Sequence, residues 1–136
     1  MATMGSGAST GAIALRNCVQ KSLAFSPALS ETSLRVKSLH RDALRSVPWV
    51  KRAYSVPLPE REMRKLLSSA FREKATVADL HQINRLIALG RMDLEETLML
   101  WKGESHVMQM FDELLEKEEK AASAPPTFLD KFYDGK

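Results

Sequence analysis

The sequence contains one cysteine, Cys18, among its 136 residues. A single cysteine excludes an intrachain disulfide and any cysteine-rich metal site. No stretch approaches the roughly 18 apolar residues that a membrane-spanning helix needs, so any membrane association is expected to be peripheral. No segment shows the alternation of apolar and polar residues that is typical of strands. We therefore expect an all-α protein, a small antiparallel helical bundle with an extension at each end.

Motifs for catalysis and metal binding are also lacking. His40, His81 and His106 are far apart and share no metal-ligand spacing. Glu95 and Glu96 are adjacent, so on a helix they would lie about 100° apart and could not act as a facing acid/base pair. The sequence has no Walker loop, nucleophile elbow or dinucleotide fingerprint. We expect a protein that is not an enzyme, with no metal and no directly bound cofactor.

Charge is distributed unevenly along the chain, although the net charge is only +3. Residues 34–75 contain eleven Lys and Arg against four Asp and Glu, whereas residues 76–136 contain seven against twelve. Such asymmetry indicates a polarised surface with a cationic docking face.

The basic segment is expected to form two amphipathic helices. Lys37, Arg41 and Arg45 recur every four residues, which places them on one helical stripe. This surface could be a solvated face, a nucleic-acid site with His40, Trp49 or Tyr54 as stacking groups, or a docking site for an acidic protein. Eleven cations should repel one another unless a partner neutralises them, which favours docking.

Local signals predict where these two helices begin and end. The first should start near residues 30–33, where Ser30, Thr32 and Ser33 offer N-cap oxygens, and should end before Pro48. Residues 49–56 would form the connection. Pro59 suits the first turn of the second helix, which should run to about Lys74.

The acidic half should contain shorter helices. Thr76 or Asp79 would cap the next helix, and Gly90 would end it. Asp93 would start another helix, and Gly103 would interrupt it. A last amphipathic helix would include Val107 and Phe111.

The two ends of the chain differ from the middle. Residues 1–30 contain no Asp or Glu and are rich in Ser, Ala and Gly, which is typical of an organellar targeting segment or of a flexible tail. Residues 31–120 would form the helical domain, and residues 121–136 a tail that anchors on a neighbouring subunit. The expected anchoring residues are Phe128, Leu129, Phe132 and Tyr133.

The triplet Leu39-His40-Arg41, with Phe71 and Arg72 downstream, resembles the LYR-motif family, whose triplet is Leu-Tyr-Arg followed by a distant Phe. Here His40 stands in place of the tyrosine. The segment from Gly90 to Thr97, the residues Trp101, Lys102 and His106 to Met108, and the tail from Phe128 to Tyr133 are similar to family members that belong to respiratory complex I, the mitochondrial NADH:ubiquinone oxidoreductase.

The resemblance implies a three-helix mitochondrial protein that binds the acidic mitochondrial acyl carrier protein. The acyl-4′-phosphopantetheine of that partner would insert between the helices. The motif match assigns carrier binding to Leu39, His40, Arg41 and Phe71, and the cationic stripes add Lys37, Arg45, Lys65 and Arg72. Candidates for the acyl channel are Val36, Ala43, Met63, Leu67, Ala70, Ile83 and Ile87.

We thus expect a non-catalytic accessory subunit of complex I, peripheral on the matrix side of the mitochondrial inner membrane. It would hold the carrier protein and contact other complex I subunits, supporting assembly, stability and electron transfer from NADH to ubiquinone. The alternative within the family is a free assembly factor for iron–sulfur proteins or respiratory complexes. A basic nucleic-acid-binding module is a further alternative.

Overall fold

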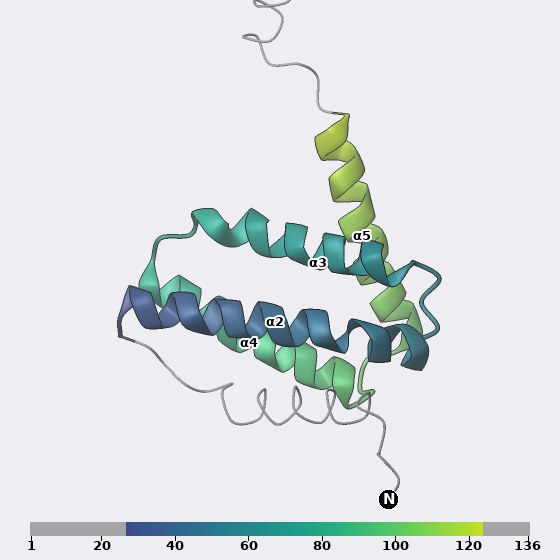
Figure 1. Cartoon of the computed structure of the whole chain (residues 1–136), viewed down its shortest axis with the longest axis horizontal. Helices are drawn as coiled ribbons and strands as arrows, with labels where there is room; N and C mark the ends of the chain where they lie inside the picture. The colour runs from purple at the N-terminus through teal and green to yellow at the C-terminus, as the bar shows by residue number, and fades with distance from the viewer. Residues whose placement is uncertain (1–26, 124–136) are drawn as a thin grey trace, which may run out of the picture.

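The computed structural model describes residues 27–123, which form helices joined by short connections (Figure 1). These are α2 (Leu29–Ala53), α3 (Glu60–Glu73), α4 (Leu80–Leu98) and α5 (Glu104–Ala122), with a 3₁₀ turn, η1 (Lys74–Thr76), after α3. The described range contains no strand, and the predicted all-α class is confirmed. The expected anchoring residues Phe128, Leu129, Phe132 and Tyr133 lie outside the described residues, as does most of the expected N-terminal segment 1–30.

The first helix is longer than predicted, and the expected stop before Pro48 is wrong. α2 continues through Pro48 to Ala53, so Trp49 lies in the helix and not in a connection. A proline inside a helix costs about 3 kcal/mol, because it removes a backbone hydrogen bond and crowds the preceding turn. The turn after Pro48 brings Val50 and Tyr54 into the core. Burial of such side chains contributes about 1.5–3 kcal/mol each, so packing outweighs the proline.

The start of α2 also differs from the predicted cap. Its N-cap is Ala28, which makes no side-chain capping bond. Thr32, one of the expected caps, lies within the first turn and is 1% exposed. Its hydroxyl donates to the carbonyl oxygen of Leu29 at 2.8 Å. The hydroxyl is therefore satisfied by its own helix.

Gly90 does not end a helix, and Asp93 does not start one. α4 is continuous from Leu80 to Leu98. Gly90 instead marks a close approach of α4 to α2, since a Cβ at this position would lie 2.8 Å from Leu39 Cδ2. The absence of a side chain lets the two helices pack closely, a role that sequence spacing does not distinguish from a helix stop.

Other predicted boundaries are confirmed. Asp79 is the N-cap of α4, and its carboxylate accepts a bond from the backbone N–H of His81 at 3.3 Å. Gly103 separates α4 from α5 and is the N-cap of α5. Pro59, expected in the first turn of the second helix, is instead the N-cap of α3, whose first turn contains Glu60 and Glu62. These carboxylates lie at the positive end of the helix dipole.

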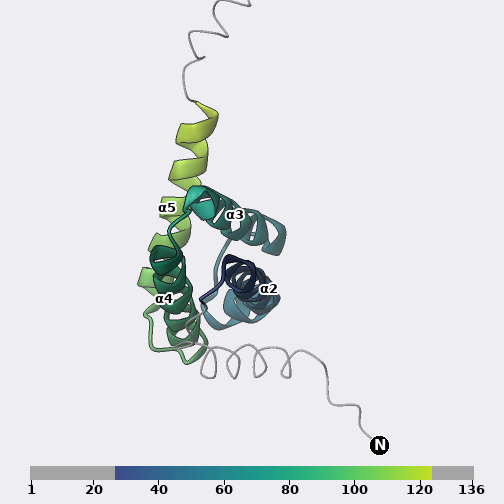
Figure 2. The ribbon, with the colours of Figure 1, turned by 90° about the vertical axis from the view of Figure 1, so that its left-hand side faces the viewer.

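The bundle is organised around α2, which packs against both α3 and α4. α3 runs antiparallel to α2 and α4, and α5 crosses α3 at a steep angle (Figures 1 and 2). The main core lies where the end of α2, the start of α3 and the start of α5 meet. Its buried residues are Val47, Val50, Tyr54, Val56, Met63, Leu66, Val107 and Phe111. α3 and α4 are not a closely packed pair, so the space between them is bounded mainly by α2 and α5.

A polar seam fixes α2 against α4. The Arg91 guanidinium, 1% exposed, donates to Asp42 Oδ2 at 2.6 Å and to Ser38 Oγ at 3.2 Å. About two turns earlier on each helix, Arg35 donates to Asn84 Oδ1 at 2.9 Å. Burial, and then the like charge of Arg91, lower the pKa of Arg35 from its ordinary value. A register shift would leave these buried charges unpaired, which is costly.

Within residues 27–123, no helix combines the length and apolar character that crossing a membrane would require.

Candidate functional site

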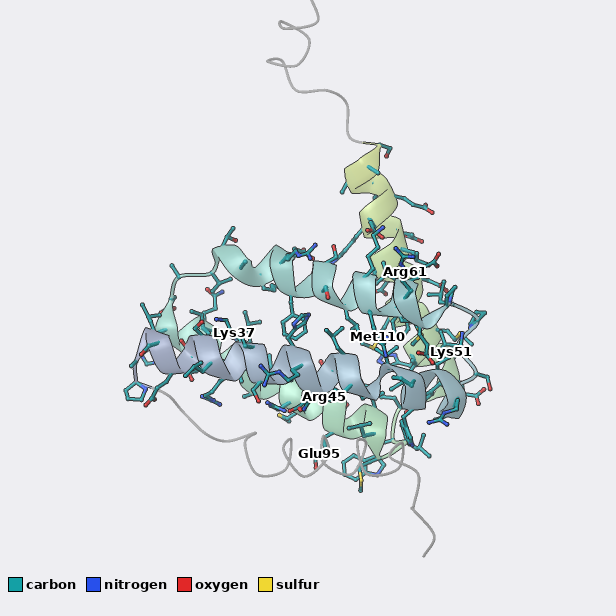
Figure 3. All side chains as sticks on the ribbon, viewed as in Figure 1. Lys37, Arg45, Lys51, Arg61, Glu95 and Met110 are labelled. Atoms are coloured by element: carbon teal, nitrogen blue, oxygen red, sulfur yellow. The ribbon has the colours of Figure 1, made fainter. Side chains whose placement is uncertain are left out.

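A row of exposed cations lies along α2. Lys37, Arg41 and Arg45 follow one another at intervals of four residues, and Figure 3 labels the first and the last of them. None of them forms an ion pair with another residue in the described range. Their charges are therefore available to a partner.

The cations of α3 extend this row across the junction with α2. Arg61, Arg64, Ser68 and Arg72 recur at spacings of three and four residues, so they share one stripe of α3. Ser68 faces His40 of α2, whereas Arg72 lines a pocket between α3 and α5, so only part of the stripe follows the seam between α2 and α3. Arg64 pairs with Glu60 at 3.8 Å, whereas Arg61 and Arg72 have no ion-pair partner among residues 27–123. Together with Lys37, Arg41 and Arg45, these residues form what we call the cationic face.

Lys65, which the stripes predicted as a carrier-binding residue, follows Arg61 by four residues but is not counted in this face because it pairs with α5. Its Nζ lies 2.9 Å from Glu118 Oε1 of α5. Nearby, Lys117 of α5 pairs with Glu73 at 3.7 Å. The charge of Lys65 is thus shared with α5, and these contacts tie α3 to the charged end of that helix.

The three residues of the motif point in three directions. Leu39 is 5% exposed and packs on Gly90. His40 is half-buried, with Nε2 at 3.0 Å from Ser68 Oγ and its ring 4.8 Å from that of Phe71. Arg41 is exposed. The motif thus connects the core, the α2–α3 seam and the solvent within three consecutive residues.

An apolar cavity of about 230 Å³ lies between the four helices. Phe71 lines it and also contacts His40, so the cavity adjoins the motif residues. The polar side chains in its lining are those of Ser46, Asp93 and Thr97. The remaining lining residues are Leu39, Ala43, Val47, Val50, Met63, Leu67, Phe71, Gly90, Leu94, Val107, Met110, Phe111 and Leu114.

Three of the expected channel residues, Ala43, Met63 and Leu67, line this cavity. The other four lie elsewhere. Ile87 is 3% exposed and Val36 and Ile83 are half-buried, but none of the three is in the lining. Ala70 lies in a separate shallow pocket between α3 and α5.

Sequence reasoning missed most of the lining from α4 and α5. Val107 and Phe111 were expected only as positions of an amphipathic helix, because apolar stripes normally pack the core. Leu94, Met110 and Leu114 were not predicted as channel residues either. Their role depends on α5 crossing α3 beside α4, which no local pattern reports. The apolar spacing of Val107, Phe111 and Leu114 was the one available signal.

The lining contains no polar group that requires a ligand. Ser46 Oγ donates to the Ala43 carbonyl oxygen, and Thr97 Oγ1 donates to that of Asp93, each at 2.8 Å. In the described part of the chain, every buried side-chain nitrogen or oxygen has a partner. The cavity exceeds the roughly 150 Å³ of engineered apolar cavities that stay dry and bind benzene, yet lies below the usual range of drug-sized sites. It suits a narrow, flexible hydrocarbon group.

A search of family models finds none that matches the chain. The chain is similar to the NADH dehydrogenase [ubiquinone] 1 alpha subcomplex subunit 6 of Dictyostelium discoideum, with 33% identity over 78 residues. The match spans 57% of this chain and 63% of that relative, so less than two thirds of the relative's length is covered. The similarity to a complex I protein that the sequence indicated is therefore confirmed.

Proposed function

We propose that this protein is an accessory subunit of mitochondrial respiratory complex I, without a catalytic site of its own, which holds an acylated acyl carrier protein on the matrix side. The observation that carries the proposal is the apolar cavity beside the cationic face, joined through the contact of His40 with Phe71. The similarity to an alpha subcomplex subunit of NADH dehydrogenase supports the choice of assembly.

The cationic face supplies the attraction for the carrier. An acyl carrier protein is acidic, and the exposed charges of Lys37, Arg41 and Arg45 have no ion-pair partner within residues 27–123. Complementary charge raises the association rate and fixes orientation more than it raises affinity. These residues would therefore steer the carrier onto α2 and α3 with the prosthetic group toward the seam.

The cavity supplies the apolar contact. The acyl chain on the carrier's 4′-phosphopantetheine would enter beside His40 and Phe71 and lie against residues such as Met63 and Leu67. Each methylene removed from water contributes about 0.8 kcal/mol. Binding of the carrier would thus depend on both its charge and its acyl chain. We expect the protein to be peripheral to the inner membrane.

Reversal of one cation tests the carrier interface. We expect Arg41→Glu to weaken binding of purified acylated carrier protein by about tenfold or more, because a carboxylate would face the carrier's acidic surface. The side chain of Arg41 is exposed, so helicity should not change. Binding would be measured by titration calorimetry, with circular dichroism as the fold control.

Lys120→Glu is the matched charge reversal. Lys120 is an exposed residue of α5 and lies outside the cationic face. This variant has the same net charge as Arg41→Glu and should bind the carrier like the unmodified chain. Equal binding by the two variants would refute docking on α2.

Membership of the assembly is tested separately. Native electrophoresis of solubilised mitochondria should show this chain in the high-mass band with NADH dehydrogenase activity. Migration only at low mass would instead favour a free assembly factor.

A further inference from the structure

α4 is apolar on two of its sides. Ile87 and Leu98 are buried at 3% and 8% exposure, on the stripe that also holds Arg91 against α2. Leu89, Met92 and Met99 follow a second stripe and are 46%, 48% and 43% exposed. A helix that only packs against its own bundle needs one apolar stripe. The second stripe has no covering element in the described part of the chain.

The connection after α4 continues this apolar surface. Leu100 is 56% exposed and Trp101 is 67% exposed. Together with Leu89, Met92 and Met99 they form what we call the corner patch. Of the large apolar residues that are exposed in residues 27–123, only Leu29, Leu34 and Met110 lie outside this patch. Contiguous exposed apolar residues of this kind mark interaction sites.

The backbone of the corner is held in place. Leu100 has a positive φ of 59°, a conformation that a leucine rarely adopts. The amide of Trp101 donates to the Glu96 carbonyl oxygen at 3.0 Å, and that of Leu100 to the Thr97 carbonyl oxygen at 3.3 Å. The Lys102 side chain, 8% exposed, bonds to Asp93 at 3.2 Å. The indole is therefore presented on a fixed turn, as a preorganised anchor would be.

The charges around Trp101 are mainly acidic. Glu95, Glu96 and Glu104 surround the corner in sequence, and none of them has an ion-pair partner within residues 27–123. Figure 3 shows Glu95 on the side of α4 that faces away from α3. Arg85 is the exposed cation of the same helix, about one turn before Leu89, whereas Arg91 is buried. The sign is opposite to that of the cationic face, so the two surfaces select different partners.

α5 begins near the corner and runs away from it (Figure 1). Its 19 residues correspond to a helix about 28 Å long. Phe128 follows Ala122 by six residues, which span at most about 22 Å when extended, so Phe128 cannot reach back to Trp101. Phe132 and Tyr133 follow Ala122 by ten and eleven residues, which span at most about 36–40 Å and could reach it. The choice of a separate chain as the occupant therefore rests on the acidic charges around Trp101.

We propose that the corner patch is a second docking surface, which inserts Trp101 into an apolar recess rimmed by lysine or arginine on another subunit of the respiratory assembly. This inference rests on the proposed function for the identity of the assembly. It makes the protein an adaptor, with the carrier on α2 and α3 and the assembly on α4. Trp and Met are enriched in the cores of interfaces, and a buried Trp commonly dominates their binding energy.

The test uses full-length chain expressed in mitochondria that lack the endogenous copy. Trp101→Asp and Met92→Asp should each reduce the amount of chain in the high-mass NADH dehydrogenase band by about tenfold or more. Leu29→Asp is the matched control, because Leu29 is 60% exposed but lies at the other end of the bundle. It should remain in the band.

Carrier binding separates this inference from the proposed function. Purified Trp101→Asp should bind acylated carrier protein as tightly as the unmodified chain, and its circular dichroism should be unchanged. If both patch variants stay in the high-mass band, the corner inference is overturned and the proposed function stands. If the unmodified chain is absent from that band, both fall.

Other occupants of the patch give distinct results in the purified protein. In a Trp49→Phe background, Trp101 should show the fluorescence of a solvent-exposed indole, with or without residues 1–26. A buried indole that becomes exposed on deletion of residues 1–26 would assign the patch to the chain's own N-terminal segment. A dimer in sedimentation that Trp101→Asp dissociates would assign it to a second copy. Either result overturns the inference.

Discussion

The triplet of Leu39, His40 and Arg41 contributes both to packing within the bundle and to its exposed surface. Leu39 is buried where Gly90 leaves room for it, and Arg41 is exposed to solvent. His40 lies between them and bridges to Ser68 and Phe71 of α3. An imidazole supplies an aromatic ring and a hydrogen-bonding group at the seam, two properties that a tyrosine would also supply. This geometry is compatible with the replacement of the motif tyrosine.

Tyr54 provides a pH-dependent contribution to stability. Its ring is 2% exposed, and its hydroxyl donates to the Thr97 carbonyl oxygen at 2.8 Å. Burial raises the pKa of Tyr54 above its ordinary value of 10.0. A raised pKa in the folded state means that the neutral phenol is favoured by folding. The contribution is therefore full below about pH 10 and declines as the pH rises through the folded-state pKa.

We expect Tyr54→Phe to lose about 1 kcal/mol of unfolding free energy at pH 7, from the missing hydrogen bond. Between pH 9 and pH 11 the unmodified protein should lose more stability than the variant, since only the former must keep Tyr54 neutral. Urea unfolding at both pH values measures the difference. An identical pH dependence of the two proteins would contradict a buried, hydrogen-bonded phenol.

The residues that sequence reasoning located correctly are those whose signals are local. Asp79 and Gly103 act at helix boundaries, and Lys37, Arg41 and Arg45 form a stripe that helical periodicity alone defines. The ion pair of Asp42 with Arg91 joins residues 49 positions apart, and no spacing rule predicts such a pair. The cavity lining from α4 and α5 was missed for the same reason, because it depends on tertiary arrangement.

At the scale of elements, the largest errors in the predicted boundaries concern α2 and α4. The first helix was expected to end before Pro48, and α4 was expected to be divided at Gly90. Both residues have low helix propensity, but propensity is a weak prior when tertiary packing opposes it. In α2 the buried Val50 and Tyr54 hold the helix beyond Pro48. In α4 the contact of Gly90 with Leu39 replaces the expected stop.

The cost of the internal proline can be measured. We expect Pro48→Ala to raise the unfolding free energy by about 2 kcal/mol. The gain is up to about 3 kcal/mol from restored helical geometry, less about 0.4–1 kcal/mol because the unfolded chain becomes more flexible. Chemical denaturation of both proteins gives the comparison.

Pro57→Ala is the control for the unfolded-state effect. Pro57 is exposed in the connection before α3, outside any helix. The unfolding free energy of this variant should fall by about 0.4–1 kcal/mol. Destabilisation by Pro48→Ala would mean that the ring of Pro48 contributes more through packing than it costs the helix.

At the scale of the whole molecule, the cavity results from the way α2 packs against two helices that are not closely packed on each other, α3 and α4. α2 is bound to α4 by the polar seam of Arg91 and Asp42, and to α3 by the core near Val47. α3 is bound in turn to α5, but it is not closely packed on α4. The molecule thus keeps an apolar space next to its cationic face, and five residues of the main core line this space: Val47, Val50, Met63, Val107 and Phe111.

Filling this space should separate stability from carrier binding. Ala43 lines the cavity and lies on the same helix as the cationic stripe. We expect Ala43→Leu to raise the unfolding free energy by about 0.5–2 kcal/mol, as cavity-filling substitutions commonly do. The same variant should bind acylated carrier protein about 15- to 60-fold less tightly, because the added atoms occupy the space of about two to three methylenes at roughly 0.8 kcal/mol each.

Binding of the carrier with and without its acyl group is the informative comparison. The unacylated carrier uses only the cationic face, so Ala43→Leu should leave its affinity unchanged. Ala75→Leu makes the same substitution at an exposed position of η1 and should affect neither form. If Ala43→Leu weakened both forms equally, the effect would come from distortion of α2. If it weakened neither, the acyl chain would have to bind elsewhere, and the cavity would be only an imperfectly packed part of the core.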